Sequence, residues 1–453
     1  MVRRIIFLSL LMTSLWSLSQ TSFESTFPLK WKTQVGVTTY RTNLLFHGGL
    51  LYIGSNGQSR ESRFDAQDGV YAIHPKTGAI VHHFQIPFGG DNDVTGIAIG
   101  DEKLFFGTDN YYFFCFDLKT KTELWKYHLP YDVESKPVVA DFNGDQKMDV
   151  AFTVQSNGIY ALDGTTGALI WNNNTISCHE GNAAPRLFDI NKDGVMDILF
   201  AGRGEANSDE INGFKMAHYG DYHIAVDGKT GGYLWAVATG AGVHTAPFIA
   251  TKNGKTEIYA LDCYGELNVI SPEGKVLKKA NFDYGMFSSP VVSNDGHLII
   301  GNTFAEIGPK AFSKENDSLP LYLNEEALVN VIRNKGKTSA TSVLADVLGK
   351  GFPQVIGITE SGEIFIAKTD GTLLAYYFVA KSGYEASQFA SNSHGKSQAH
   401  LVHTNGILTG SETSLFVADI DADGNLEIVI ADLNGFLYCF DTKSAGKVEF
   451  GGF

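Results

Sequence analysis

The chain has 453 residues, of which 43% are hydrophobic and 19% are charged, and its formal net charge is −15. Binding of nucleic acid needs a basic surface, so this charge disfavours a nucleic-acid partner. The 49 glycines, 31 phenylalanines and few charged residues are typical of an all-β protein with many turns.

The first residues have the three zones of a secretory signal peptide. Arg3 and Arg4 precede an apolar stretch over 5–16, and the small residues Ser17 and Ser19 follow. We expect residues 1–19 to be a signal peptide that is cleaved after Ser19, and the mature protein to be secreted or periplasmic. The apolar stretch is too short to cross a bilayer and no later segment is long enough, so no transmembrane segment is expected.

A unit of strand, Gly-containing turn and strand recurs along the chain. Its clearest copy is Gly158-Ile-Tyr-Ala-Leu-Asp163-Gly-Thr-Thr-Gly167-Ala-Leu-Ile-Trp171. Near-copies lie at residues 69–78, 114–125, 224–235, 362–367 and 435–441. A period of about 40 to 70 residues with four short strands per unit indicates a β-propeller.

The repeats predict one all-β domain over residues 20–453, an eight-bladed propeller of four-stranded antiparallel blades, with seven blades as the alternative. The third strand of each blade is expected near Gly69, Tyr112, Gly158, Tyr222, Gly265, Pro320, Gly362 and Gly435. The sixth blade, near Pro320, lacks the Gly turn and also fits a short helix. The segment 29–35 lies outside the units, so we expect it to pair with the last blade and close the ring.

Three acidic loops, starting at Asp141, Asp189 and Asp419, carry side-chain oxygens at loop positions 1, 3, 5 and 9. This spacing surrounds a tight turn with oxygen ligands, which suits Ca²⁺. An EF-hand has a Glu ligand at position 12, but here position 12 falls in an apolar β-type run, so an EF-hand is excluded. The predicted ligands of about three structural Ca²⁺ ions, which would belong to blades 3, 4 and 8, are Asp141, Asn143, Asp145, Asp149, Asp189, Asn191, Asp193, Asp197, Asp419, Asp421, Asp423 and Glu427.

These motifs resemble two known repeat families. The Tyr-Ala-Leu-Asp-x-x-Thr-Gly-x-x-x-Trp units look like the propeller repeats of PQQ-type quinoproteins and of the outer-membrane assembly lipoprotein that shares them. The acidic loops resemble the FG-GAP calcium repeats of integrin-type propellers. Together the resemblances cover nearly the whole mature chain and imply a propeller and a cation, but a fold does not fix a function.

Quinone-dependent dehydrogenases of this kind carry a vicinal cysteine pair and are considerably longer. This chain has no adjacent cysteines, so we do not expect it to be a quinone-dependent dehydrogenase. We interpret Trp125, Trp171 and Trp235 as packing of each fourth strand against the next blade. Cys115 and Cys439 are expected to be buried, while a disulfide between Cys178 and Cys263 stays open.

The turns equivalent to the acidic loops in blades 5 and 7 lack ligands and are expected to be metal-free. In blade 7 the first residue, Asp346, is kept, but Lys350 replaces a ligand at position 5. We hypothesise that the Lys350 ammonium pairs with Asp346 and partly replaces the cation. The Lys255 ammonium stands at the equivalent place in blade 5.

The four strands of each blade are called a to d, outward from the axis. Almost all of the long connections are b–c or d–a connections, and these lie on one face of the expected disc. We call this the loop-rich face. Binding and catalysis usually reside in long loops on a rigid scaffold, so we expect the functional site there, at the mouth of the central channel near blades 4 and 5. The candidate residues are His179, Arg203, His218, Tyr219, His223 and His244.

Two functions remain open. In the first, the protein is a monomeric, secreted, calcium-stabilised propeller that binds a polysaccharide or an extracellular protein. In the second, it is a polysaccharide lyase, in which Arg neutralises a uronic acid and Tyr or His transfers protons. The alternatives to both functions are ordinary structural roles for these histidines and a solvated charged loop at 202–221.

Overall fold

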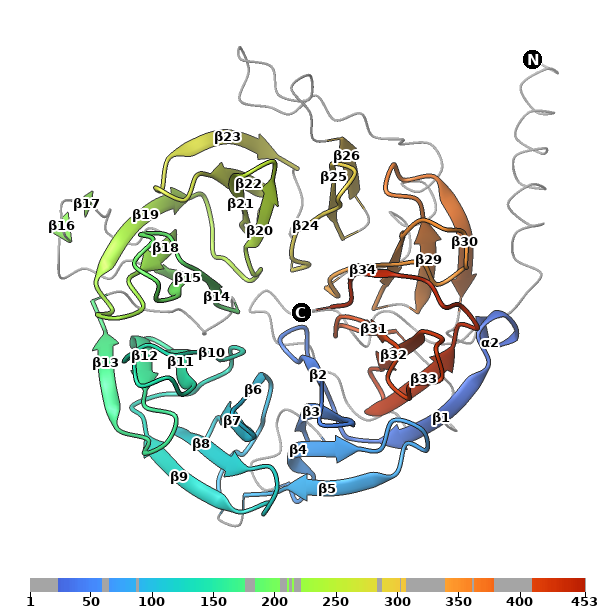
Figure 1. Cartoon of the computed structure of the whole chain (residues 1–453), viewed down its shortest axis with the longest axis horizontal. Coiled ribbons are helices and arrows are strands. Elements are labelled where there is room, and N and C mark those ends of the chain that lie inside the picture. The colour runs from blue at the N-terminus through green and yellow to red at the C-terminus, as the bar shows by residue number, and fades with distance from the viewer. Residues whose placement is uncertain are drawn as a thin grey trace.

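The computed structural model describes residues 23–58, 65–86, 89–175, 184–203, 210–211, 214–215, 221–282, 287–301, 303–306, 339–360, 362–378 and 410–452. In this part of the chain, antiparallel sheets radiate around a central axis as the blades of a β-propeller (Figure 1). The predicted signal peptide lies outside the described residues.

The strands of the first five blades follow the chain order. Blade 1 contains β2 (Leu44–His47), β3 (Leu50–Asn56), β4 (Asp68–Ile73) and β5 (Ile80–Phe84). Blade 2 contains β6 (Ile97–Gly100), β7 (Lys103–Gly107), β8 (Tyr112–Asp117) and β9 (Glu123–His128). Blade 3 contains β10 (Val138–Ala140), β11 (Asp149–Val154), β12 (Gly158–Leu162) and β13 (Leu169–Asn173). Blade 4 contains β14 (Arg186–Phe188), β15 (Asp197–Arg203), β18 (Asp221–Val226) and β19 (Tyr233–Thr239), with a separate hairpin of β16 (Glu210–Ile211) and β17 (Phe214–Lys215). Blade 5 contains β20 (Phe248–Lys252), β21 (Lys255–Leu261), β22 (Glu266–Ile270) and β23 (Val276–Asn281).

The last two blades are each completed by a terminal strand. Blade 7 contains β27 (Val343–Ala345), β28 (Gln354–Ile358), β29 (Glu363–Ala367) and β30 (Leu373–Phe378), and β34 (Val448–Phe450) adds to β27. Blade 8 contains β31 (Phe416–Ala418), β32 (Glu427–Ala431) and β33 (Phe436–Asp441). Its fourth strand is β1 (Leu29–Gln34), which pairs antiparallel with β33. The expected ring closure by the N-terminal strand is therefore confirmed.

The prediction of eight four-stranded blades is wrong. The described residues form seven sheets with four or more strands. In place of the predicted blade 6, β24 (Val291–Val292), β25 (His297–Ile300) and β26 (Thr303–Glu306) form a three-stranded sheet. The sequence that follows lacks the Gly turn that introduces the fourth strand of the other units. We keep the numbers 1–5, 7 and 8 for the seven blades and call β24–β26 the incomplete sheet.

Tryptophans in the outermost strands of blades 2, 3, 4 and 8 contact the next blade. The indole N–H of Trp171 in blade 3 donates to the carbonyl of Gly228 in blade 4 at 2.8 Å, and that of Trp235 donates to Pro272 in blade 5 at 2.8 Å. Trp31 on β1 donates in the same way to Pro75 of blade 1 at 2.6 Å. The interpretation of these tryptophans as inter-blade packing is confirmed.

The glycine of each Thr-Gly turn lies against such an indole. Gly231 has φ +71°, and a Cβ atom there would lie 2.5 Å from the ring of Trp171. Replacement of Gly231 by Ala is expected to destabilise the protein by about 2 kcal/mol or more, because it adds backbone strain and displaces the ring. Urea unfolding would measure this. A Gly254→Ala control, at φ +74° with nothing within 4 Å of the added carbon, isolates the strain from the clash.

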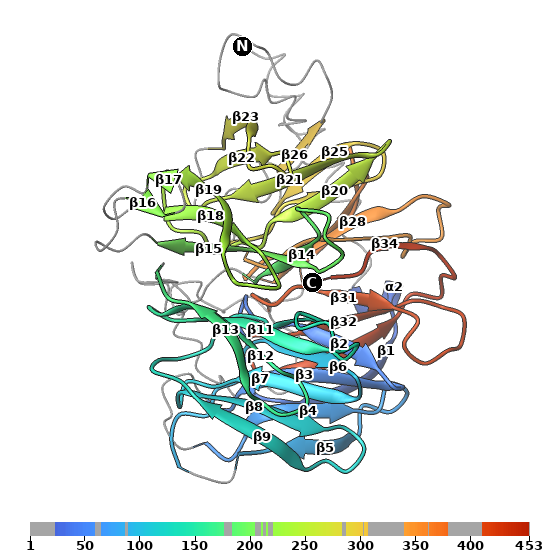
Figure 2. The ribbon, with the colours of Figure 1, turned by 60° about the vertical axis from the view of Figure 1, so that its left-hand side comes forward.

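The hydrophobic clusters lie between neighbouring blades. One cluster combines Phe152 of blade 3 with Phe113 of blade 2, whose rings stack with centroids 3.8 Å apart. Another packs α2 (Phe23–Thr26) against Tyr377 of blade 7 and Phe440 of blade 8. The view in Figure 2 shows the blades side by side around the axis. The described part of the chain contains no helix long and apolar enough to cross a membrane.

Candidate functional site

The three acidic loops are turns between the first and second strands of blades 3, 4 and 8, as predicted. They share one backbone conformation, with a positive φ at loop positions 4 and 6. The residues at these positions are Gly144 and Gln146, Lys192 and Gly194, and Ala422 and Gly424. A non-glycine residue in this region is strained, so its recurrence indicates that the surrounding contacts determine the turn.

In blades 3 and 4 the ninth loop residue fixes the turn to the rest of the blade. Asp149 is 1% exposed, and it accepts hydrogen bonds from the backbone N–H groups of Phe142, Asn143 and Gly164 at 3.0 to 3.2 Å. Asp197 accepts three equivalent bonds in blade 4. Burial raises the pKa of both carboxyls, and the backbone donors oppose this shift.

The remaining side chains of these two loops converge on the same turn. Asp141 accepts bonds from the N–H groups of Gly144, Asp145 and Gln146, and the Asn143 carbonyl accepts one from Asp145. The side chains at positions 1, 3, 5 and 9 thus all accept hydrogen bonds from backbone N–H groups, within the loop or next to it. Carboxylate and amide oxygens are the ligands that Ca²⁺ prefers, so the donor chemistry of blades 3 and 4 fits this ion.

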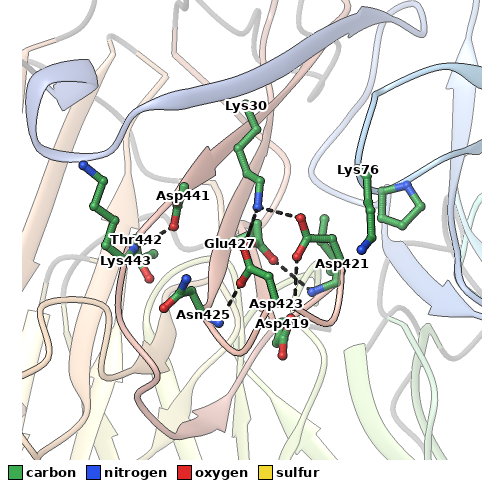
Figure 3. A network of polar contacts seen from close by, with 12 residues as sticks. Lys30, Lys76, Asp419, Asp421, Asp423, Asn425, Glu427, Asp441, Thr442 and Lys443 are labelled. Carbon is green, nitrogen blue, oxygen red and sulfur yellow. Dashed lines mark hydrogen bonds and ion pairs between the residues drawn. The ribbon is translucent and has the colours of Figure 1, made fainter.

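The loop of blade 8 already contains a positive charge from the chain itself. The Lys30 ammonium on β1 lies 2.6 Å from Asp421, 3.0 Å from Glu427 and 3.3 Å from Asp423 (Figure 3). Glu427 is 0% exposed and Asp421 is 7% exposed. Burial opposes ionisation of Lys30, but the three carboxylates raise its pKa above the ordinary value.

Lys30 occupies a bulge in the outermost strand, where the register shifts between Leu29 and Trp31. Each of the other six blades has a bulge at the equivalent place. The residue there is apolar in all six: Val81, Leu124, Ile170, Leu234, Leu277 and Leu374. A bulge redirects a side chain locally. The lysine is therefore specific to the blade whose loop has three carboxylates at positions 3, 5 and 9.

The hypothesis that Lys350 replaces the cation in blade 7 is wrong. The Lys350 side chain is exposed, and the side-chain amide of Gln354 donates instead to Asp346 at 2.9 Å. The backbone N–H groups of Lys350 and Gly351 also donate to Asp346, each at 2.7 Å. In blade 5 the turn is a tight hairpin in which Lys255 pairs with Glu257 at 2.8 Å. A neutral amide at position 9 is enough to close the blade 7 turn.

Three of the six predicted residues on the loop-rich face fall outside the described part. His179, His218 and Tyr219 lie there, and so does Cys178, whereas its proposed partner Cys263 has a free thiol. For Arg203 the structure describes the backbone, which pairs with Asp221 at the end of blade 4.

His223 lies inside blade 4 and away from solvent. It is 4% exposed on β18, between Ala201 and Val237 of the neighbouring strands, and its Nε2 atom has no hydrogen-bond partner. Burial lowers its pKa to about 4. The imidazole is thus neutral near pH 7 and has almost no surface with which to contact a polymer.

His244 lines the central channel, in the connection that leads into β20. Its Nδ1 atom lies 3.4 Å from the Tyr40 hydroxyl, and its ring packs against Phe287 with centroids 4.8 Å apart. These three side chains help to form a cavity of about 40 Å³ at the axis. The other walls come from the residues that precede the first strands of most of the blades. The structure does not bring His223 to this cavity.

Two cations that the sequence analysis missed line the same cavity: Lys136, just before β10, and Arg186, the first residue of β14. Burial, with a contribution from the Arg186 charge, lowers the pKa of Lys136 to about 7, and burial lowers that of Arg186 to about 9. No carboxylate of the described residues pairs with Lys136. Arg41, which also lines the cavity, pairs with Glu134. A proline adjoins each residue at the entry to the first strand, in Lys136-Pro137 and Pro185-Arg186, and this is the sequence signal for these positions.

A cavity of about 620 Å³ lies on the opposite face. It is formed by the first hairpin of blade 5, the incomplete sheet and β34, and its walls include Lys252, Lys278 and Glu449. Its lysines are partly engaged: Lys252 donates to the Asn294 carbonyl at 3.3 Å. This cavity adjoins the incomplete sheet rather than the long connections.

Comparisons with known proteins agree with the motifs and the fold. A family model described as an FG-GAP-like repeat matches residues 137–200, which include the acidic loops of blades 3 and 4. Comparison with curated proteins finds no matching relative.

Several solved structures share the architecture at low sequence identity. BamB from Moraxella catarrhalis is 14% identical, with a TM-score of 0.53 over 92% of this chain and 99% of that one. A europium-containing methanol dehydrogenase is 12% identical, with a TM-score of 0.58 over 94% and 95%. Quinohemoprotein alcohol dehydrogenase from Comamonas testosteroni is 13% identical, with a TM-score of 0.57 over 96% and 79%. The resemblance to quinoprotein-like propellers with an FG-GAP-like repeat is confirmed, at the level of fold and repeat.

Proposed function

We propose that this protein is an exported, calcium-stabilised β-propeller that binds an acidic polysaccharide at the channel mouth on its loop-rich face. The FG-GAP-like repeat and the propeller fold support a ligand-binding or structural role. Export would supply the calcium, because Ca²⁺ outside the cytoplasm is abundant enough to fill sites of modest affinity.

The calcium part of the proposal rests on blades 3 and 4. Each loop carries two aspartates and one asparagine besides a buried ninth aspartate, and a cation would neutralise the carboxylates of this short turn. Ca²⁺ would be held by Asp141, Asn143, Asp145 and Asp149 in blade 3, and by Asp189, Asn191, Asp193 and Asp197 in blade 4. In blade 8, Ca²⁺ would have to displace the Lys30 ammonium, so we propose no resident ion there.

One observation carries the choice of ligand: Lys136 and Arg186 share one cavity at the axis, and Lys136 has no carboxylate partner among the described residues. Two adjacent, partly buried basic groups favour an anion between them. Uronic-acid residues present a carboxylate, which Arg binds through two parallel hydrogen bonds. The volume of about 40 Å³ accepts one such group rather than a whole sugar ring, so the polymer would lie across the channel mouth.

The test is binding of polygalacturonate by isothermal titration calorimetry, with neutral dextran as the comparison. Lys136→Gln and Arg186→Gln are each expected to weaken binding of polygalacturonate by roughly tenfold or more, since a hydrogen bond to a charged group contributes about 1.5–3 kcal/mol. Lys252→Gln removes a lysine from the cavity on the opposite face and is expected to leave binding unchanged. Equal binding of dextran, or a loss only in Lys252→Gln, contradicts the proposal.

A further inference from the structure

A second group of carboxylates lies on the loop-rich face, far from the acidic loops along each blade. Asp68 begins β4 in blade 1, and Asp91 and Asp93 belong to the connection between β5 and β6. One oxygen from each of the three lies within 4.8 Å of the other two. Asp68 and Asp93 are both only 2% exposed. Three carboxylates are thus gathered where water has little access.

Asp68 shows that this group is more than a set of solvated acids. Both of its carboxylate oxygens are buried, and neither accepts a well-formed hydrogen bond. Burial, followed by the charges of Asp65 and Asp91, raises the pKa of Asp68 to about 7. The backbone N–H groups of Asn92 and Asp65 lower this pKa, but by less than burial and the two charges raise it. Buried carboxylates are normally paired or coordinate a metal. Asp68 has no Lys or Arg partner among the described residues.

A fourth oxygen faces the same place. Asn56 ends β3 and is directly paired with Asp68 across the sheet, so the two side chains project from the same face. Asn56 is 4% exposed, and its Oδ1 atom is also buried without a hydrogen-bond partner. Two neighbouring side chains therefore hold three buried oxygens without hydrogen-bond partners, and one of these side chains, Asp68, lies beside Asp91 and Asp93.

We propose that Asn56, Asp68, Asp91 and Asp93 form a binding site for a divalent cation, Ca²⁺ in an exported protein. All four side chains offer hard oxygen donors. The three carboxylates neutralise the two charges of Ca²⁺ and leave one negative charge in excess. This site is separate from the FG-GAP-type loops. Its ligands come from the b–c connection of blade 1 and the following d–a connection, not from one continuous loop, and it would join blade 1 to blade 2.

The first test is the number of Ca²⁺ ions bound, measured by calorimetric titration of the chelator-treated full chain and by elemental analysis. Asp68→Asn is expected to bind one Ca²⁺ fewer than the wild type. Asp117→Asn is the control, because Asp117 ends β8 and belongs to none of the carboxylate groups that could hold an ion among the described residues. An unchanged count in Asp68→Asn, or an equal loss in Asp117→Asn, overturns the proposal.

A second measurement keeps the test valid if the substitution changes stability. In excess chelator, Asp68→Asn is expected to melt at or above the wild-type temperature, since it removes a buried charge that repels its neighbours. In millimolar Ca²⁺ it is expected to melt below the wild type, since it has lost a bound ion. A substitution that lowers the melting temperature equally in both conditions shows a purely structural role for Asp68 and overturns the proposal.

Discussion

Removal of calcium with excess chelator is expected to lower the midpoint of thermal unfolding by about 5 °C. A ligand at 100 times its Kd stabilises a protein by about 2.7 kcal/mol, so two such sites give roughly 5 kcal/mol. At about 2.1 cal/mol/K per residue, unfolding of roughly 430 residues has an entropy near 0.9 kcal/mol/K, which converts this energy into about 5 °C. Differential scanning calorimetry in Ca²⁺ and in chelator measures the shift.

Variants of the ninth loop residues assign this effect to the loops. Asp149→Asn and Asp197→Asn keep the shape of the side chain and remove the charge that binds the ion. Each is expected to lose the part of the chelator response that its own site supplies, about 2.7 kcal/mol. Asp346→Asn in blade 7 is the control, since a side-chain amide already closes that turn, and it is expected to keep the full response. A wild-type melting curve that is the same with and without chelator contradicts calcium stabilisation.

Replacement of Lys30 by Met is expected to destabilise the calcium-free protein by about 3–5 kcal/mol. The substitution leaves Asp421 and Glu427 buried without their cation, and the loss of one partner from a buried ion pair typically costs this much. The effect should include the ring closure, because Lys30 lies on the strand that completes blade 8. Urea unfolding in chelator measures the loss.

Calcium should reverse most of this loss. Without Lys30, the loop of blade 8 has the same kinds of ligands as blades 3 and 4, so Lys30→Met is expected to bind one additional Ca²⁺ and to regain stability in millimolar Ca²⁺. Lys32→Met, an exposed position on the same strand, is the matched control with no such effect. If Lys30→Met is as stable as Lys32→Met in chelator, the ammonium does not stabilise the loop.

The sequence predicts the scaffold well because the relevant interactions are local. The alternation of each strand and the Gly turn lie within a few residues, and the Trp-to-turn contact recurs in four of the blades. The acidic loops follow from side chains no more than nine positions apart. The blade count fails where this local signal is missing, after β26, since no Gly turn there marks a fourth strand.

The candidate site is harder to predict, because its contacts join distant parts of the chain. Lys30 meets Glu427 across 397 positions, and only the circular closure of the propeller explains this contact. His223 has an ordinary place in the sequence of a third strand, and its burial depends on which face of blade 4 packs against its neighbour. Lys136 and Arg186 become a pair only when the inner ends of blades 3 and 4 meet at the axis. Lys350 does not replace the cation, because the side-chain amide of Gln354 in the same turn donates to Asp346.

Anomalous diffraction from crystals grown with Ca²⁺ tests the central claim most directly, because it locates each ion rather than counting ions. The account predicts strong peaks in the loops of blade 3, at Asp141 and Asp149, and of blade 4, at Asp189 and Asp197. It predicts no peak beside Lys30 in blade 8. Loops in blades 3 and 4 that hold only water at millimolar Ca²⁺ would contradict a calcium-stabilised propeller.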